Sequence, residues 1–397
     1  MLLLATKVWE QRKLGDIFSK IRNAFVGKVT DYYVDRGFIY LESNNIKNGG
    51  INLNTKKYIN NEFYYQQKEK WLHTNDIVMV QSGDVGQTAV IPSNLNNTAA
   101  HALIMFQEID SNINPYFLNY QFQSYRCIKQ IQIISKGNTV KHVLASDMKE
   151  FTVFLASLKE QINVADFLNK LNRIIDLYER KVKLLLQIKK YLLNNLFSEK
   201  EYPDLRFKYS KKDNWKKISL SSVLTYKNGK AHEKEINNKG NLDLVMMNSI
   251  TTEGRLITKK KIFSPQDTLS KNDIVIVLSD IAKGELIGKS SVIPCDDQYV
   301  LNQRIGCLRP TSNIDSFFVS KYINQKSQYF KSHAAGTSQI NLSKSDVLNC
   351  TIYIPNIDEQ HYVSNFIINI EKNINFYKDK KQCFIEIKNT LLNNMFI

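Results

Sequence analysis

The longest regular pattern in this chain is a heptad of apolar residues in a segment without glycine or proline. Between residues 159 and 197, apolar side chains recur at alternating spacings of three and four residues. They are Leu168, Leu171, Ile175, Tyr178, Val182, Leu185 and Leu192, with Lys189 at the one step that lacks an apolar residue. This spacing places an apolar stripe along a helix and is typical of a coiled coil. A helix over this range would be roughly 58 Å long at 1.5 Å per residue.

The same pattern returns near the C-terminus. Its apolar positions are Ile367, Ile370, Ile374, Tyr377, Phe384 and Leu391, and Lys381 and Lys388 fall in the stripe. A helix with one apolar stripe must bury it against a partner. We expect the two helices to pair in antiparallel orientation, because a duplicated chain packs most simply around a two-fold axis. The alternative is that each helix folds back on its own domain.

The two helical segments belong to a repeat that runs through the whole chain. From Gly137 to Phe197 the sequence aligns without a gap to Gly336 through Phe396, and 18 of the 61 aligned positions are identical. Shorter matches continue upstream, such as Asn75-Asp76-Ile77-Val78 with Asn272-Asp273-Ile274-Val275. We therefore predict a pseudo-two-fold repeat of four parts: a domain at 1–156, a helix at 157–200, a domain at 201–355 and a helix at 356–397.

The two predicted domains have the pattern of mixed α/β structure. Short β-rich runs occur at 38–41, 77–80 and 274–277, bounded by Gly, Asn and Asp. Helices are predicted to open at 114–117 and 314–317. Polar loops containing glycine separate these elements, at 44–50, 81–88 and 135–142 and at the equivalent places in the second half. The predicted fold class is α+β, with two α/β domains separated by two long antiparallel helices.

The charge of the chain favours a polyanionic partner. Lys and Arg number 54 against 38 Asp and Glu, a formal net charge of +16. Such an excess suits nucleic acid, although a basic protein from a lysine-rich proteome would show it too. The five cysteines form no Cys-x-x-Cys pair, and no apolar stretch reaches membrane length. We expect a soluble cytoplasmic protein with reduced thiols.

Motifs for catalysis, metal binding or cofactor binding are missing from the sequence. The segment 284–290 resembles a phosphate-binding loop but has three residues between its glycines instead of four. The six histidines are scattered, without zinc-ligand spacing. We expect no catalytic residue, no metal and no cofactor in this chain.

Four stretches resemble a known family, the specificity subunits of type I restriction–modification enzymes. They are residues 9–17 (Trp-Glu-Gln-Arg-Lys-Leu-Gly-Asp-Ile), 202–207 (Tyr-Pro-Asp-Leu-Arg-Phe), the loop from Gly336 to Leu342, and Tyr353-Ile354-Pro355 running on to Glu359-Gln360. The resemblance covers essentially the full chain. In the first half, Lys141-His142 stand where the second half has Ile340-Asn341.

The resemblance implies a non-catalytic subunit that binds double-stranded DNA. Each domain would be a target-recognition domain for one part of a split sequence. The two helices would form the spacer and dock two modification subunits, which carry the methyl-donor chemistry. Restriction subunits would join for ATP-dependent cleavage. Two alternatives stay open: a protein-docking scaffold with incidental DNA contact, and a DNA-acting enzyme in one chain.

Polar residues of the predicted loops are the candidate contacts to DNA, since base edges are read by hydrogen-bonding side chains. In the first domain the candidates are Asn45, Lys47, Asn48, Gln81, Ser82, Lys136, Asn138, Thr139 and Lys141. In the second domain they are Asn248, Ser249, Arg255, Lys283, Lys289, Arg304, Ser338, Gln339 and Asn341.

Overall fold

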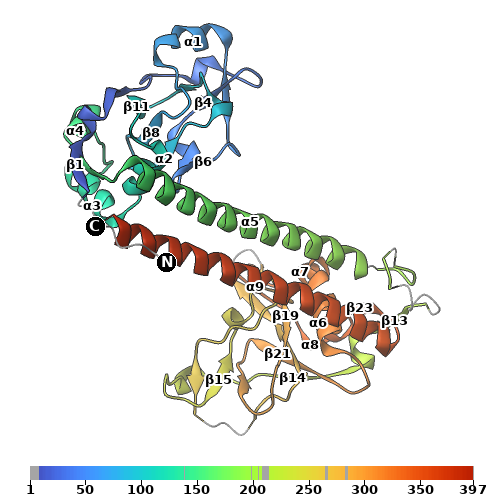
Figure 1. The fold of residues 1–397 in the computed structure, drawn as a ribbon. Coiled ribbons are helices and arrows are strands. Elements are labelled where there is room, and N and C mark those ends of the chain that lie inside the picture. The colour runs from blue at the N-terminus through green and yellow to red at the C-terminus, as the bar shows by residue number, and fades with distance from the viewer. Residues whose placement is uncertain are drawn as a thin grey trace. The chain divides into compact units, whose positions relative to one another are not determined.

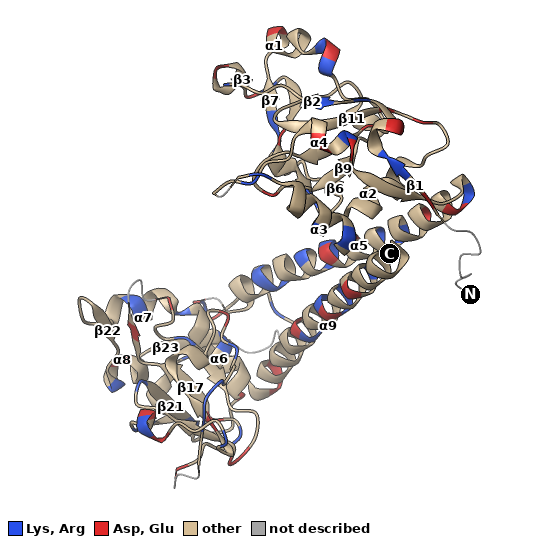
Figure 2. Ribbon diagram, turned by 90° about the vertical axis from the view of Figure 1, so that its left-hand side faces the viewer, with Lys and Arg blue, Asp and Glu red and all other residues tan. Residues whose placement is uncertain are grey.

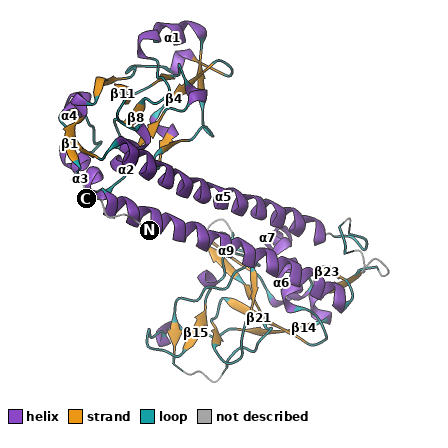
Figure 3. Ribbon diagram, in the orientation of Figure 1, coloured by secondary structure: helices purple, strands orange, loops and turns teal. Residues whose placement is uncertain are grey.

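The chain folds into two compact units, each built from both halves of the sequence. The computed structural model describes residues 9–137, 139–197, 199–203, 205–207, 214–263, 267–281 and 285–396. The first unit comprises Met1–Glu179 with Lys378–Ile397, and the second comprises Arg180–Tyr377. Each unit combines strands with short helices and with parts of two long helices (Figure 3).

The first unit is organised around two four-stranded sheets. Its strands are β1 (Glu10–Lys13), β2 (Phe18–Asn23), β3 (Tyr33–Val34), β4 (Phe38–Leu41), β5 (Ile46–Lys47), β6 (Gly50–Ile51), β7 (Lys57–Ile59), β8 (Ile77–Val80), β9 (Thr88–Val90), β10 (Ala99–Ala100), β11 (Leu103–Ile109) and β12 (Thr152–Leu155). Its short helices are α1 (Asn61–Gln66), α2 (Pro115–Phe122), α3 (Tyr125–Ile134) and α4 (Ala145–Lys149). The main sheet has the antiparallel order β2-β11-β8-β9, and the other has the order β10-β4-β7-β3, in which β10 and β4 are parallel.

The second unit repeats this plan. Its strands are β13 (Lys216–Ser219), β14 (Leu224–Asn228), β15 (Leu242–Val245), β16 (Lys261–Ile262), β17 (Ile274–Val277), β18 (Ser279–Ile281), β19 (Ser290–Val292), β20 (Tyr299–Leu301), β21 (Ile305–Pro310), β22 (Gln339–Asn341) and β23 (Thr351–Ile354). Its short helices are α6 (Ser316–Gln325), α7 (Ser327–His333) and α8 (Lys344–Leu348). The main sheet, β14-β21-β17-β19, has the same antiparallel order as β2-β11-β8-β9. The predicted internal repeat is therefore confirmed.

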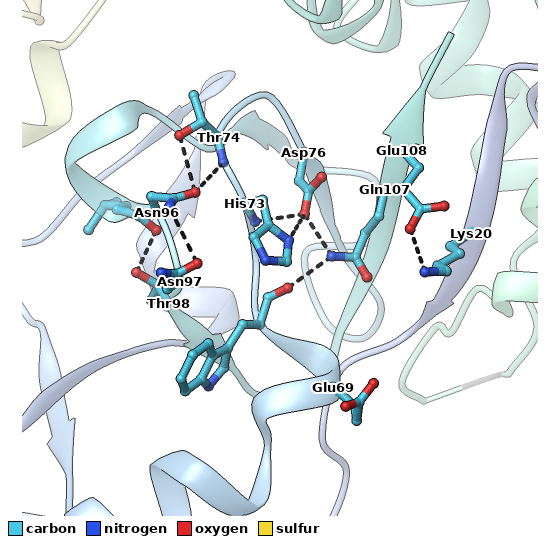
Figure 4. Close-up of polar contacts among 12 residues, drawn as sticks. Lys20, Glu69, His73, Thr74, Asp76, Asn96, Asn97, Thr98, Gln107 and Glu108 are labelled. Atoms are coloured by element: carbon cyan, nitrogen blue, oxygen red, sulfur yellow. Dashed lines mark hydrogen bonds and ion pairs between the residues drawn. The ribbon is translucent and has the colours of Figure 1, made fainter.

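The repeated Asn-Asp-Ile-Val motif starts the buried strand of each main sheet. Asn75 and Asn272 adopt the left-handed conformation, with φ of 74° and 71°. In the first unit, the buried Asp76 carboxylate accepts hydrogen bonds from the His73 backbone N–H (2.8 Å) and Gln107 Nε2 (2.7 Å), as Figure 4 shows. In the second unit, Asp273 accepts from the Ser270 backbone N–H (2.8 Å) and receives two hydrogen bonds from the Arg309 guanidinium. The repeat thus keeps the carboxylate and its backbone donor and changes the side-chain partner from Gln107 to Arg309.

A glutamine at the start of each long helix ties that helix to its unit. The helices are α5 (Leu158–Leu196) and α9 (Ile357–Met395). Gln161 accepts from the Asn114 N–H and donates to the Ala156 carbonyl oxygen. Gln360 bonds Asp315 and Pro355 in the same way. This shared function explains why the glutamine recurs at 161 and 360.

The two long helices pack against each other in antiparallel orientation (Figure 1). In the first unit, Tyr178 of α5 stacks on Phe384 of α9 at 5.7 Å between ring centroids, and Leu168 shares a core with Leu392. In the second unit, Lys181 lies over the Tyr377 ring and Leu196 shares a core with Ile367. Within each unit, the residue number on α9 therefore falls as the number of the contacting residue on α5 rises, which is the antiparallel arrangement. All thirteen residues predicted for the helix seam are buried or half-buried. The predicted fold class and helix pairing are confirmed.

The alternative packing, in which a helix folds back on its own domain, also occurs in part. Residues of the first turns of α5, such as Leu168, share the core of the first unit with β2 and α2. The last residue described on that side, Phe396, packs edge-on against Trp9 and Phe117 at 5.7 and 5.2 Å. In the second unit, Phe197 packs edge-on against Tyr322 at 5.6 Å and at a tilted angle against Phe318 at 5.1 Å. Each core therefore takes the start of one long helix and the end of the other.

Candidate nucleic-acid interface

In the first unit, three loops that are distant in sequence meet at one place. The β5–β6 turn joins the 81–88 loop, because the Asn48 N–H donates to Gln87 Oε1 at 3.0 Å. The 81–88 loop joins the 136–142 hairpin through the Ser82–His142 bridge and a hydrogen bond from the Gly83 N–H to the Lys141 carbonyl oxygen (3.4 Å). The sequence placed candidate contacts in all three loops, and the structure brings the loops together.

Glycines with left-handed backbones shape these loops. Gly49, with φ of 80°, completes an Asn-Gly turn whose carbonyl oxygen accepts from Asn119 Nδ2 on α2 (2.8 Å). Gly137 and Gly336 close the equivalent hairpins of the two units, with φ of 106° and 131°. A Cβ atom at either position would overlap a carbonyl oxygen across the hairpin, Val140 or Gln339. Only glycine allows this hairpin, which explains why both halves retain it.

In the second unit, the equivalent hairpin forms a short ladder with β18. Strands β18 and β22 pair antiparallel, with Ser279 opposite Asn341, Asp280 opposite Ile340 and Ile281 opposite Gln339. The Asp280 side chain is buried and accepts from the N–H groups of Ile281 and Leu286, both at 2.7 Å. These bonds hold the exit of β18 in place beside the hairpin.

Most candidate contacts in these loops are accessible to a ligand. Exposed candidates are Lys47, Asn48, Lys136, Thr139, Lys141, Asn248, Ser338 and Asn341, and half-buried ones are Gln81, Ser82, Arg304 and Gln339. Asn138 and Lys283 lie outside the described residues. Asn248 and Arg304 line a hollow of about 180 Å³ with Glu233, Met246, Met247 and Asn302. Within the described residues, that hollow includes no member of the β18–β22 ladder.

Two candidates are corrected by the structure. Asn45 and Ser249 are 2% and 3% exposed. Each accepts from the backbone N–H three residues before it, Glu42 (2.9 Å) or Met246 (3.0 Å), and so closes a turn. Their polar groups are used inside the protein and do not face a ligand. A short polar residue in a loop has the same sequence signature in either role.

Two other candidates point toward the helices of their own unit. Arg255 donates to Asn375 Oδ1 of α9 at 3.4 Å. The Lys289 ammonium donates to the Asn324 carbonyl oxygen at the end of α6 (3.4 Å), and burial lowers its pKa, with Lys331 lowering it further. These two side chains connect their loops to α9 and α6.

Charged residues of both signs lie along the two long helices, where Lys and Arg alternate with Asp and Glu (Figure 2). Throughout the part of the chain that the structure describes, no cluster of three His, Cys, Asp or Glu side chains could hold a metal ion. None of the described helices has the length and hydrophobicity to cross a membrane.

One family model matches the chain twice, at residues 6–187 and 212–384, and that family is the type I restriction modification DNA specificity domain. The chain belongs to this family. Each match covers one repeat, and the family is the one that the sequence motifs indicated. A specificity domain is the DNA-recognising part of its enzyme, and this chain carries two of them.

Relatives of the specificity family are similar over nearly their full lengths. The specificity subunit of the type I restriction enzyme MjaVIII from Methanocaldococcus jannaschii is 20% identical over 408 residues, covering 97% of this chain and 91% of that protein. The crystal structure of a type I S subunit from M. genitalium has a TM-score of 0.64 at 16% identity, covering 100% of this chain and 98% of that one. A chain from a study of complex assembly and conformational transition of the type I R-M system has a TM-score of 0.57 at 15% identity, covering 98% and 97%. The two solved structures share the fold of this specificity-family chain.

The sequence did not single out three residues of the β18–β22 ladder. Ser279, Asp280 and Ile281 follow the buried strand β17 after one residue, Leu278, and their equivalents, residues 82–84, lie in the 81–88 loop. Ser82 and Ser279 occupy equivalent positions in the two halves. An alignment of the repeat that extended across this loop would have identified them.

Proposed function

We propose that this chain is the DNA-recognition subunit of a type I restriction–modification complex and reads a target in two separate parts. The observation that carries the proposal is the double match to the DNA specificity family. A loop cluster with accessible polar side chains in each unit supports it. The recognition domains are residues 1–156 and 201–355, and the helices at 157–200 and 356–397 form the spacer.

Each domain makes two kinds of contact with its half-site: contacts that position the domain on the DNA, and contacts that distinguish the bases. Lysines such as Lys47, Lys136 and Lys141 contact phosphates or guanine, and amides and hydroxyls contact base edges in the major groove. The pseudo-two-fold repeat supports half-sites read in opposite orientation, with one target adenine on each strand. We expect the chain to act in the cytoplasm.

The chain has no catalytic function of its own in this proposal. Two modification subunits perform methyl transfer, and restriction subunits perform ATP-dependent cleavage, so this chain binds no cofactor. The pure chain, incubated with DNA, methyl donor, ATP and magnesium, should yield neither methylated nor cleaved DNA. A product from the pure chain would support the alternative of a DNA-acting enzyme.

The helices carry apolar residues on a face away from their own seam. On α5, Leu184, Ile188 and Tyr191 are 56%, 39% and 61% exposed and are spaced four and three residues apart, so they share a helix face. Ile387 of α9, the repeat equivalent of Ile188, is 42% exposed. Exposed apolar stripes mark protein contacts. We assign these stripes to the docking of two modification subunits.

Docking is tested by charge substitution in the stripes. Ile188→Asp and Ile387→Asp should each remove one of two modification subunits, because burying a carboxylate in an apolar contact is costly. Native mass spectrometry of the purified complex reports the stoichiometry. Asn194→Asp, an exposed change on α5, is the control. Two bound subunits in both isoleucine variants would refute the assignment.

DNA recognition is tested by the salt dependence of binding. A sequence-reading protein that neutralises phosphates should lose affinity steeply with salt and keep its preference for one bipartite site. Binding of the assembled complex to specific and scrambled duplexes, measured over a salt series, gives both quantities. The second candidate, a scaffold with incidental DNA contact, is favoured by the exposed stripes and predicts no preference between the duplexes.

A further inference from the structure

We infer that the β18–β22 ladder of the second unit reads one A·T base pair in the major groove. Gln339 contacts the adenine, and Ile281 contacts the thymine methyl group. The inference rests on the proposed function and adds the chemistry of one base pair to it. It follows from the register in which β18 and β22 pair, and from which hydrogen-bonding groups of the ladder's side chains are already bonded and which are not.

The register places four side chains on one face of the ladder. Residues directly opposite each other in an antiparallel pair lie on the same face, and successive residues alternate between faces. Ser279, Ile281, Gln339 and Asn341 therefore share a face, and Asp280 lies on the other. Exposure varies along this face, because Ile281 is 59% exposed while Ser279 is 7% exposed; Asp280 on the other face is 5% exposed.

The Gln339 carboxamide is oriented but retains binding capacity. Asn341 Oδ1 accepts from the Ser279 hydroxyl at 2.5 Å and from Gln339 Nε2 at 3.1 Å. Among the described residues, neither Gln339 Oε1 nor its second amide N–H has a hydrogen-bond partner. One acceptor beside one donor is the arrangement that pairs with N6 and N7 of adenine. Orientation before binding reduces the entropy lost on contact.

Ile281 supplies the apolar contact next to this amide. Its side chain stands opposite Gln339 in the ladder, at the distance of a cross-strand pair, about 5 Å between Cβ atoms. The major-groove edge of one A·T pair presents a hydrogen-bonding adenine beside the thymine methyl group. An amide and an aliphatic side chain side by side match that edge and not a G·C edge.

The first unit carries different chemistry at the equivalent positions. Its Ser82–His142 bridge corresponds to Ser279–Asn341, so Asp84 and Val140 stand in the places of Ile281 and Gln339. A carboxylate accepts from cytosine N4, and valine offers no amide. The A·T-reading pair is therefore specific to the second unit, and the two half-sites differ at this position.

The first experiment selects DNA with the full chain assembled with its modification subunits. The probe is a library of double-stranded DNA with random half-sites, used with wild type, Gln339→Ala and the control Gln325→Ala, an exposed glutamine at the end of α6. Wild type and control should select the same bipartite site. Gln339→Ala should lose roughly 10- to 100-fold discrimination at one A·T pair in one half-site, with all other positions unchanged.

The second experiment replaces the thymine of that pair by uracil, which removes only the methyl group. Wild type should bind the uracil duplex about fourfold more weakly, the value of one buried methyl group. In Ile281→Ala, thymine and uracil duplexes should bind equally. Both variants should keep their preference at the other half-site, which shows that the chain is folded.

Four results would overturn the inference while leaving the proposed function intact. The first is selection of G·C at the pair that Gln339→Ala affects, and the second is no change of base preference in Gln339→Ala. The third is that Gln339→Ala binds all sequences uniformly more weakly, with a shallower dependence of affinity on salt. The fourth is that Ile281→Ala still binds the thymine duplex more tightly than the uracil duplex. The third would make Gln339 a phosphate contact. Failure of the wild-type complex to select any bipartite site would instead overturn the proposed function.

Discussion

Equivalent residues of the two repeats have acquired different surroundings, and the seam lysines are the clearest case. Lys189 and Lys388 occupy the same register and are 9% and 8% exposed. Lys189 pairs with Glu371 at 2.6 Å, and Glu371 also pairs with Lys321. Lys388 donates to the neutral Gln123 Oε1 at 3.1 Å and, among the described residues, has no carboxylate within ion-pair distance. A carboxylate therefore compensates the buried Lys189 ammonium, whereas only a neutral amide bonds the buried Lys388 ammonium.

We predict that Lys388→Met stabilises the protein. Burial lowers the pKa of Lys388, although Asp176 partly opposes this, so the unfolded chain binds the proton more tightly. The resulting penalty is fully present at neutral pH and disappears as pH rises towards 10.5. Lys388→Met should add about 1 kcal/mol to the free energy of unfolding at neutral pH, and less at alkaline pH. Urea unfolding across this pH range measures both.

The matched control for this prediction is Lys189→Met. It removes a hydrogen bond to the half-buried Glu371 carboxylate and should cost about 1–2 kcal/mol. Equal losses in both variants would show that Gln123 compensates Lys388 as well as Glu371 compensates Lys189.

At the scale of elements, each core depends on the end of a helix that begins in the other repeat. Phe396 closes the Trp9–Phe117 cluster, and Phe197 packs against Phe318 and Tyr322. This explains why the closing Leu-Leu-Asn-Asn-x-Phe motif is the best-conserved part of the repeat. Each copy of the motif fits a core of the same design.

Phe396→Ala should destabilise the first unit by about 3–5 kcal/mol, the usual cost of deleting a buried phenyl ring. The effect should be local, because Phe396 belongs to the core cluster of the first unit and its ring packs against Trp9 and Phe117 there. Hydrogen exchange should show faster opening of β1 and α2 and an unchanged β17. The control Tyr191→Ala, an exposed change on α5, should leave the exchange rates of both units as in the wild type. Equally faster exchange in both units of Phe396→Ala would contradict a local role.

At the scale of the whole molecule, we expect the paired helices to set the gap between the half-sites. Inserting four residues at facing positions of α5 and α9 lengthens each by about 6 Å, close to two base pairs of DNA. The selected DNA should then show a longer unspecific gap and unchanged half-sites. Sequencing of methylated adenines in cells that express the complex measures gap and half-sites together. An unchanged gap would refute the role of the helices as a spacer.

Much of this architecture could be predicted from local pattern. The strands at 38–41, 77–80 and 274–277, the helix starts at Asn114 and Asp315, and the thirteen seam positions all follow from periodicity and capping. The sequence located the polar loops, but it did not predict which residues in them face solvent and which bond inside the protein. Asn45 and Ser249 are turn-closing residues, and Lys289 is directed into α6, because side-chain direction depends on neighbours distant in sequence.

The sequence by itself determined the repeat, the two amphipathic helices and the family, because each is encoded in residue order and spacing along the chain. Only the tertiary structure decided which loops meet, which candidates are buried and which face of the β18–β22 ladder is exposed. The physical reason is that these properties arise from contacts between segments such as 279–281 and 339–341. No local pattern records the register in which such segments pair.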